Sequence, residues 1–185
     1  HRLRRALSIP EIILSAEDMY YLNRELTIWC DLWEFERLLK EAETHQRQGR
    51  LDEAHQLRVE ALKLVRGEFC ADLPDMEWIS IRRHELTYTC DTLLREVVRY
   101  HLRRQEWGEA LQYGQQMLAL DAFDEEAHRL VMFCQAKLGQ RSAAMKHYRS
   151  LVRSLQRHQG AEPEPETTAL YERIARRASD LSLDF

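Results

Sequence analysis

Apolar residues recur three and four positions apart along most of this chain, which is the spacing of helices that bury one face. From Asp31 onward this spacing predicts seven consecutive helices separated by short polar breaks. Their expected ranges are 31–48, 51–65, 75–104, 107–120, 125–138, 141–157 and 166–178. The third is long because no glycine or proline interrupts it. Short connections between such helices favour antiparallel neighbours that stack on one another.

The first 30 residues follow a different pattern. Residues 1–7 are typical of the end of a basic helix, which Pro10 would stop. Two short β-prone runs, 12–14 and 19–22, flank a polar turn, and residues 26–29 are the candidate for a third strand. The sequence therefore predicts a small β-hairpin or meander ahead of the helices.

An internal repeat with a period of 34 residues is the strongest feature of the helical part. Where a turn meets a second helix, a glycine or glutamine is followed five residues later by an alanine. Two such pairs are 34 residues apart, and a third lies earlier in the chain at a different spacing. The three pairs are Gly49 and Ala54, Gln105 and Ala110, and Gly139 and Ala144. Tetratricopeptide units have this period and place small residues where their two helices cross. The expected fold is mainly α, with tetratricopeptide-like stacked antiparallel helix pairs and a small N-terminal β-hairpin; a plain helical bundle with chance spacing is the alternative.

Composition agrees with a globular helical protein. The 185 residues are 44% hydrophobic and 31% charged, with six glycines and four prolines. The four cysteines, Cys30, Cys70, Cys90 and Cys134, are scattered without a C-x-x-C pair, which argues against a zinc site and for reduced thiols. The longest strictly apolar run, 130–134, is too short to span a membrane, so we expect a cytoplasmic protein without membrane contact. The chain starts at His1 and not at a methionine, and we expect it to be part of a longer protein.

Enzymatic chemistry finds no support in the sequence. Neither a G-x-G-x-x-G motif nor a P-loop is present, and the glycines are too sparse to cradle a phosphate. His84 and Glu85 begin like a zinc-protease helix, but Tyr88 stands where the second histidine is needed. We therefore predict no enzymatic activity, no cofactor and no metal.

Two groups of basic residues stand out against the net charge of -4. The first is the cluster of Arg2, Arg4 and Arg5, a candidate for phosphate contacts with DNA. The second lies between residues 127 and 161, which hold seven Lys or Arg residues and no acid. Four of the seven share one helix face, which we call the basic stripe: Lys146, Arg149, Arg153 and Arg157.

The basic stripe has two interpretations. Its opposite helix face is apolar and should point to the core, with Ala144, Tyr148, Leu151, Val152 and Leu155. The stripe could simply be a solvated outer face, or it could dock an acidic partner or the DNA backbone. Acids cluster just before this region, at 121–126, so a polarised surface is expected in either case.

Short motifs follow one another in a set order from Asp31 to Arg177. They are Asp31–Glu36, Arg66–Phe69, Asp72–Asp75 with Trp78, Ala127–Met132, Leu138–Arg141, Ala144–Tyr148, Gly160–Thr167 and Leu170–Arg173. This order resembles the bacterial transcriptional activator domain of SARP-type antibiotic-pathway regulators and related signalling proteins. The closing G-x-E-P-x-P-E-T run before a helix is the most specific of these pieces.

The resemblance implies a division of the chain. Residues 1–30 would be the end of a winged-helix DNA-binding domain of the response-regulator type, with the tail of its recognition helix and its wing hairpin. Residues 31–178 would be the helical-repeat activator domain, and residues 179–185 a tail.

A transcription regulator is the function that this resemblance implies. The winged helix would hold promoter DNA, while the repeats would contact RNA polymerase, another protein, or a second copy in a homo-oligomer. The alternative is a tetratricopeptide-type scaffold that binds a protein or peptide within a larger signalling protein.

Overall fold

A computed structural model describes residues 10–16, 19–74, 76–178, 181–183 and 185. Seven α-helices occupy the described part of the chain after residue 30. They are α2 (Asp31–Arg47), α3 (Leu51–Leu64), α4 (Glu77–Arg103), α5 (Trp107–Leu120), α6 (Glu125–Lys137), α7 (Arg141–His158) and α8 (Pro165–Ala175). Each lies within three residues of the range that its apolar spacing predicts. The seven helices confirm the mainly α fold.

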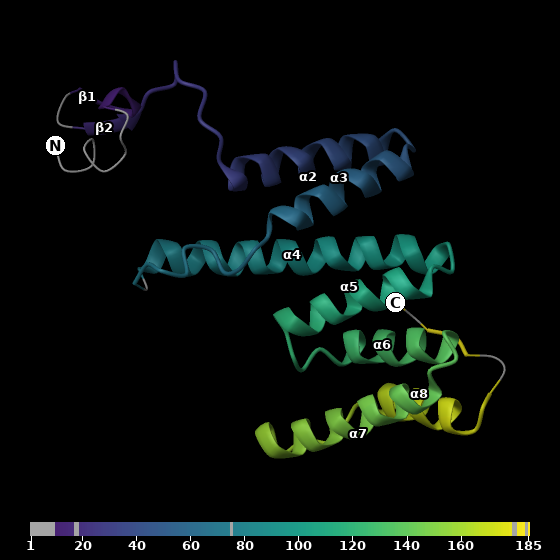
Figure 1. The fold of residues 1–185 in the computed structure, drawn as a ribbon. Coiled ribbons are helices and arrows are strands. Elements are labelled where there is room, and N and C mark those ends of the chain that lie inside the picture. Colours follow the sequence, from purple (N-terminus) through teal and green to yellow (C-terminus); the bar gives the residue numbers. More distant parts are fainter. Residues whose placement is uncertain (1–9, 17–18, 75, 179–180, 184) are drawn as a thin grey trace.

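A two-stranded hairpin precedes the helices, after a short 3₁₀ turn at Pro10–Ile12. Strands β1 (Ile13–Ala16) and β2 (Met19–Leu22) pair antiparallel, with Ile13 opposite Leu22 and Ala16 opposite Met19. The predicted hairpin is confirmed, but the candidate third strand at 26–29 is wrong. A turn after β2 diverts the chain, because Asn23 accepts hydrogen bonds from the backbone N–H groups of Glu25 and Leu26. The next residues lead to α2 and do not return to the hairpin (Figure 1).

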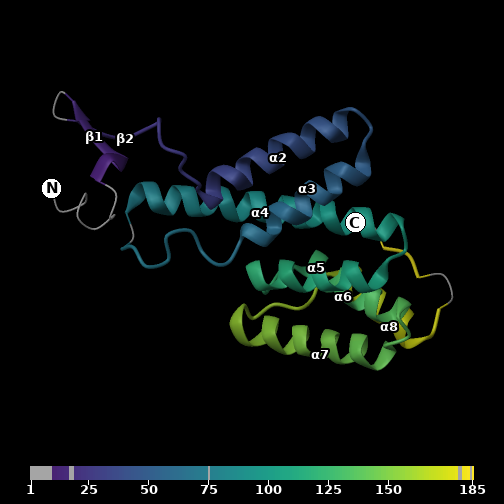
Figure 2. The ribbon, with the colours of Figure 1, turned by 45° about the horizontal axis from the view of Figure 1, so that its top comes forward.

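The helices stack as antiparallel pairs. Helices α2 and α3 form the first pair, α4 and α5 the second, and α6 and α7 the third, while α8 packs against both α6 and α7. Figures 1 and 2 show that these layers follow one another in chain order, with the hairpin beside the first pair and α7 at the far end. The predicted tetratricopeptide-like arrangement is therefore present.

The same helix ending occurs four times, and its occurrences at Gln105 and Gly139 account for the predicted period of 34 residues. The first helix of each pair stops at a residue with left-handed backbone, and the next residue donates its N–H to a carbonyl five positions back, as in a Schellman motif. These residues are Gly49 (φ 74°), Gln105 (φ 58°), Gly139 (φ 77°) and Arg177 (φ 56°). The fourth marks α8 as the first helix of a further repeat, so α2, α4, α6 and α8 are equivalent positions in the stack.

Small residues permit the close crossings that the repeat predicts. Ala54, Ala110 and Ala144 each lie five residues after a left-handed residue and are fully buried. The larger core cluster joins α4 to α8 and includes Leu130 and Met132. A smaller cluster around Phe35 and Leu93 joins α2, α3 and α4. No helix in the described residues is long and apolar enough to cross a membrane.

Candidate functional site

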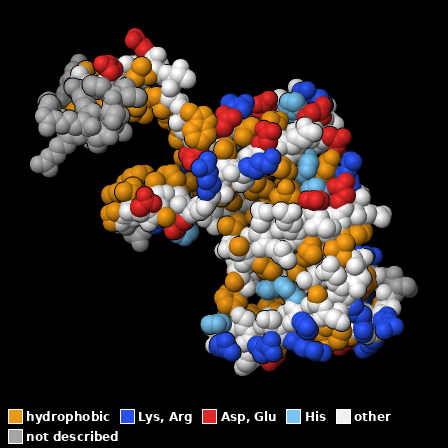
Figure 3. Space-filling model, viewed as in Figure 1, with side chains coloured by type: hydrophobic (Ala, Val, Ile, Leu, Met, Phe, Trp, Pro, Cys, Tyr) orange, Lys and Arg blue, Asp and Glu red, His pale blue; other side chains and the backbone are white. Residues whose placement is uncertain are grey.

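Helix α7 has one face in the core and one face in solvent. Ala144, Leu151 and Leu155 are buried, and Tyr148 and Val152 are half-buried, as the apolar spacing predicts. The four residues of the basic stripe are all exposed on the other side. Because a helix rises 1.5 Å per residue, the stripe runs for about 16 Å from Lys146 to Arg157. Figure 3 shows Lys and Arg side chains gathered along the lower edge of the molecule, where α7 lies.

The fold itself uses three of the seven cations between residues 127 and 161. Arg129 pairs with Glu164 and donates to Thr167 Oγ1 at 2.9 Å, and Arg141 donates to the Ile174 carbonyl at 2.8 Å. The ammonium of Lys137 lies 5.2 Å from the centre of the Phe133 ring. The four cations of the stripe, by contrast, make no ion pair or side-chain hydrogen bond to any described residue. The stripe is therefore the part of this basic region that remains available to a partner.

Three acids of the cluster at 121–126, namely Asp124, Glu125 and Glu126, contact other parts of the fold. Arg95, on α4, pairs with Asp124 and Glu126, and its Nε lies 2.8 Å from the carboxylate of Asp91. Asp124 also caps α6, because its Oδ1 accepts the N–H of Ala127 at 3.0 Å. Glu125 accepts the backbone N–H of Glu164 at 2.9 Å. These acids hold α4, α6 and the start of α8 together, so they do not neutralise the basic stripe.

A histidine pair lies between α6 and α7, on the inner side of α7. His128 Nε2 lies 3.1 Å from the carbonyl of Ala122, which can only accept, so this nitrogen carries the hydrogen. His128 Nδ1 then accepts the Nε2–H of His147 at 2.7 Å. Burial, and next the neighbouring His128, lower the pKa of His147 to about 4. His147 is therefore neutral at pH 7 and adds no charge to the stripe.

The other predicted DNA-contacting residues, Arg2, Arg4 and Arg5, lie outside the described residues. The hairpin that follows them presents all four side chains of β2 to solvent, namely Met19, Tyr20, Tyr21 and Leu22. The structure thus places the hairpin and the basic stripe at opposite ends of the stack and does not bring them together (Figure 1).

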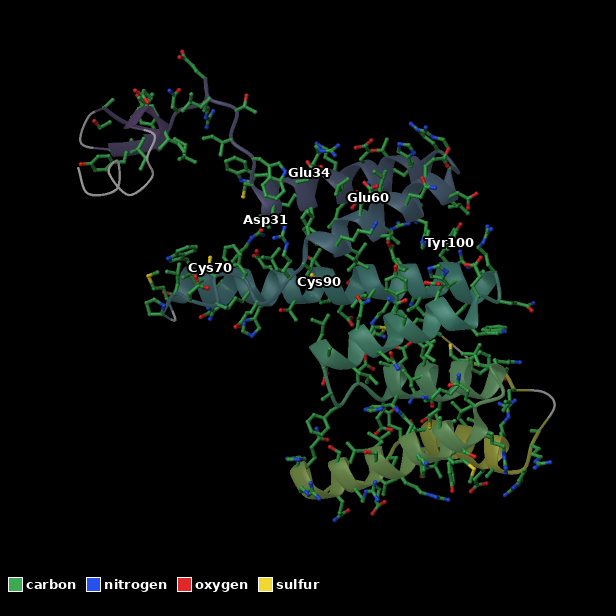
Figure 4. The ribbon with its side chains drawn as sticks, viewed as in Figure 1. Asp31, Glu34, Glu60, Cys70, Cys90 and Tyr100 are labelled. Carbon is green, nitrogen blue, oxygen red and sulfur yellow. The ribbon has the colours of Figure 1, made fainter. Side chains whose placement is uncertain are left out.

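Apolar exposure near the hairpin is a feature that the sequence-based interpretation missed. Trp29, Trp33 and Trp78 are each at least half exposed and lie around the starts of α2 and α4. A cleft of about 880 Å³ lies between α2, the segment 64–70, α4 and the end of α5. Cys70 and Cys90, labelled in Figure 4, both line it. Three of the four tryptophans fall within residues 29–78, which is the signal that could have indicated this surface.

The part of the chain that the structure describes contains no candidate metal site. No three His, Cys, Asp or Glu side chains there are grouped to hold an ion. Cys90 and Cys134 are buried, and burial raises the pKa of both thiols, that of Cys134 to about 12. These two cysteines therefore behave as small core side chains.

Three comparisons place the chain among known proteins. Residues 30–175 match the family described as the bacterial transcriptional activator domain. The structure of Mycobacterium tuberculosis EmbR, solved in complex with a low-affinity phosphopeptide, is similar with a TM-score of 0.64 and 20% identity. That match covers 98% of this chain and 48% of EmbR, so the chain spans about half the length of that protein.

The helical repeats also have a counterpart in a eukaryotic protein. The C-terminal TPR-containing domain of a Plasmodium falciparum FK506-binding protein matches with a TM-score of 0.54 and 12% identity. The match covers 80% of this chain and 93% of that domain, so it supports a tetratricopeptide-like fold and nothing about function. No curated protein sequence matches the chain.

Proposed function

Since the chain belongs to the family of bacterial transcriptional activator domains, we propose that it is the protein-contacting helical part of a transcription regulator. Its family is one of regulators and not of enzymes. The finer proposal is that the basic stripe of α7 docks an acidic protein surface, on RNA polymerase or on another protein. The observation that carries it is the set of four exposed cations that no described acid neutralises.

The position of the stripe favours a protein over the DNA that a winged helix would hold. The hairpin lies beside the first helix pair and α7 at the far end of the stack (Figure 2). Helices pack 8–10 Å apart, so three to four layers separate the two by about 30 Å. A straight duplex held at the hairpin would reach the stripe only if it ran along the stack. A second copy of this chain is a weaker fit, because Asp124 and Glu126 of its acidic cluster already pair with Arg95.

We further propose that residues 1–30 belong to a winged helix that holds promoter DNA, with β1 and β2 as its wing. An isolated two-stranded hairpin is marginally stable in water. This one exposes Met19, Tyr20, Tyr21 and Leu22 together, which supports a larger domain around it. The fold likeness to EmbR extends over 98% of the chain and so includes the hairpin, which supports the same proposal.

The test uses the longer regulator with its upstream domain, in purified transcription with RNA polymerase and in gel shifts on its own promoter. In the variant Lys146→Glu, Arg149→Glu and Arg153→Glu we expect unchanged helicity, unchanged DNA binding and at least tenfold lower activation. A matched control places the same charge change on other exposed cations, as Lys40→Glu, Lys63→Glu and Arg103→Glu. This control should activate normally.

Two outcomes would contradict these proposals separately. Equal activation by the stripe variant and the control would leave the stripe as a solvated face. A longer chain that prefers its promoter no more than random DNA would remove the winged-helix proposal. The alternative function, a scaffold for a protein or peptide within a larger signalling protein, would then be favoured, with the apolar cleft beside Cys70 and Cys90 as one candidate surface.

A further inference from the structure

The segment after α8 does not continue the alternation of helix pairs. Arg177 ends α8 with the same left-handed cap that Gly49, Gln105 and Gly139 provide, and in those three repeats a second helix follows at once. The described residues after this fourth cap, 178, 181–183 and 185, carry no helix or strand. Figure 1 shows the yellow end of the chain passing from α8 back toward α5 and α4. The segment therefore turns back over the earlier repeats instead of forming a further antiparallel helix.

Its side chains alternate in burial. Leu181, Leu183 and Phe185 are half-buried and pack against the larger core cluster, whereas Ser182 between them is exposed. A period of two is the signature of an extended chain that lies with one side on a surface. The segment is therefore seated on the repeats as an extended peptide.

The two ends of the segment contact different repeats. On α8, Arg173 directs both of its terminal nitrogens at Ser182 Oγ, at 3.3 and 3.4 Å. On α4, the guanidinium carbon of Arg99 lies 5.7 Å from the centre of the Phe185 ring, within cation–π range. The segment thus crosses the surface formed by equivalent first helices, which we call the α4–α6–α8 face.

Side chains alone hold the described part of this segment. Leu181, Leu183 and Phe185 form no backbone hydrogen bond, although helix caps and turns elsewhere in the described chain form many. The α4–α6–α8 face does not depend on the segment for its own helices, because each helix closes its hydrogen bonds within itself or at its cap. Attachment of this kind is reversible in principle, since no ladder or helix must break for release.

We propose that the α4–α6–α8 face is a binding site for an extended protein segment with apolar residues at alternate positions, and that residues 181–183 and 185 occupy it in cis. The ligand chemistry follows from the described residues of the segment: two leucines separated by a residue whose hydroxyl faces Arg173, and an aromatic ring near Arg99. A partner with this pattern displaces the segment, which acts as a built-in competitor. The site is separate from the basic stripe on α7 and does not rest on the function proposed for it.

The experiment compares the full chain with a chain that ends at residue 178. The probe is a fluorescein-labelled peptide of residues 178–185, and binding is read by fluorescence anisotropy. A tethered competitor acts at an effective concentration on the order of 1 mM, and a short peptide should bind with a Kd of about 10 to 100 µM. We therefore expect the shortened chain to bind the probe about 10- to 100-fold more tightly than the full chain.

Matched peptides test the register. Leu183→Ser in the probe should reduce binding to the shortened chain at least tenfold. Ala178→Ser, at the start of the probe and outside the set of residues packed on the core cluster, should change it less than twofold. In the protein, Arg99→Ala should weaken the probe severalfold, while Arg103→Ala, one turn on and also exposed, should not.

A full-length variant keeps the proposal testable if the shortened chain is unstable. Leu181→Ser, Leu183→Ser and Phe185→Ser together release the segment without shortening the chain, and the free peptide added in trans should then raise the Tm of this variant. A folded shortened chain that does not bind the probe would overturn the proposal. A destabilised triple variant that the peptide does not restore would do so as well, because the segment would then be ordinary core.

Discussion

Gly114 offers a sharp test of how closely the repeats pack. It lies in α5 at the crossing with α6, and it is buried. A β-carbon added there would lie 2.8 Å from Leu130 Cδ2 and 3.3 Å from Val131 Cγ2. Leu130 and Val131 are themselves 0% and 1% exposed, so neither side chain can move into solvent to make room. Gly114→Ala should therefore force α5 and α6 apart or force strained rotamers.

Two opposing terms set the size of the effect. Alanine in a helix interior is favoured over glycine by about 0.8 to 1.0 kcal/mol. Overpacking a filled core costs about 1 to 3 kcal/mol. The net expectation for Gly114→Ala is a loss of about 1 kcal/mol in the free energy of unfolding. The matched control is Gly108→Ala in the first turn of the same helix, where an added β-carbon meets nothing within 4 Å. That change should be neutral or stabilising by about 0.5 kcal/mol, since only the propensity acts.

Urea unfolding followed by circular dichroism measures both variants. The two should differ by about 1.5 kcal/mol in opposite directions, with equal slopes against urea, because neither change alters the surface exposed on unfolding. For a chain of this size that corresponds to a difference of roughly 3 to 6 °C in Tm. If Gly114→Ala proved as stable as Gly108→Ala, the close crossing of α5 and α6 would not be a constraint on the sequence.

Three further changes test the caps and the histidine pair. Gln105→Gly should stabilise the chain by about 0.5 to 1 kcal/mol in thermal unfolding, because the left-handed backbone at this position is strained for glutamine and unstrained for glycine. Asp124→Ala should cost about 2 kcal/mol in the same assay, because it removes the cap of α6 and one partner of Arg95. His147 stays neutral in the fold down to a pKa of about 4, while the unfolded chain takes up this proton near pH 6.5, so stability rises with pH across that window. His147 should contribute about 2 to 3 kcal/mol to the fall in the free energy of unfolding from pH 7 to pH 4, and His147→Gln should reduce the fall by this amount; equal slopes would show that the pair does not titrate with folding.

The features that could be predicted from the sequence are those that depend on residues close together in the chain. The helices and the apolar face of α7 come from spacing, which a helix fixes within one or two turns. Residues 26–29 are β-prone in isolation, but the turn at Asn23 overrides that preference and leads them away from β2. The 34-residue offset placed Gln105 at a repeat boundary, but a glutamine there gives no sign of the left-handed backbone that it shares with Gly139.

Long-range pairing explains what the sequence could not reveal. Arg129 and Arg141 looked no different from the four cations of the stripe, yet their partners lie 35 and 33 residues further on. Glu164 stands at the cap of α8 without capping it, because its carboxylate turns to Arg129. The seating of Phe185 near Arg99 joins positions that no sequence period relates.

The charge that a partner meets differs in sign from the charge of the whole chain. The net charge of -4 counts every acid equally, yet Asp124 and Glu126 are consumed by Arg95 at the junction of α4 and α6. The opposite charges of these acids and Arg95 largely cancel within a few ångströms. What remains is screened beyond the Debye length of about 8 Å at physiological salt. The stripe on α7 has no such partner among the described residues, so its field extends into solvent. Helix α7 therefore attracts an acidic surface even though the net charge of the whole chain is negative. This attraction should weaken steeply as the salt concentration is raised.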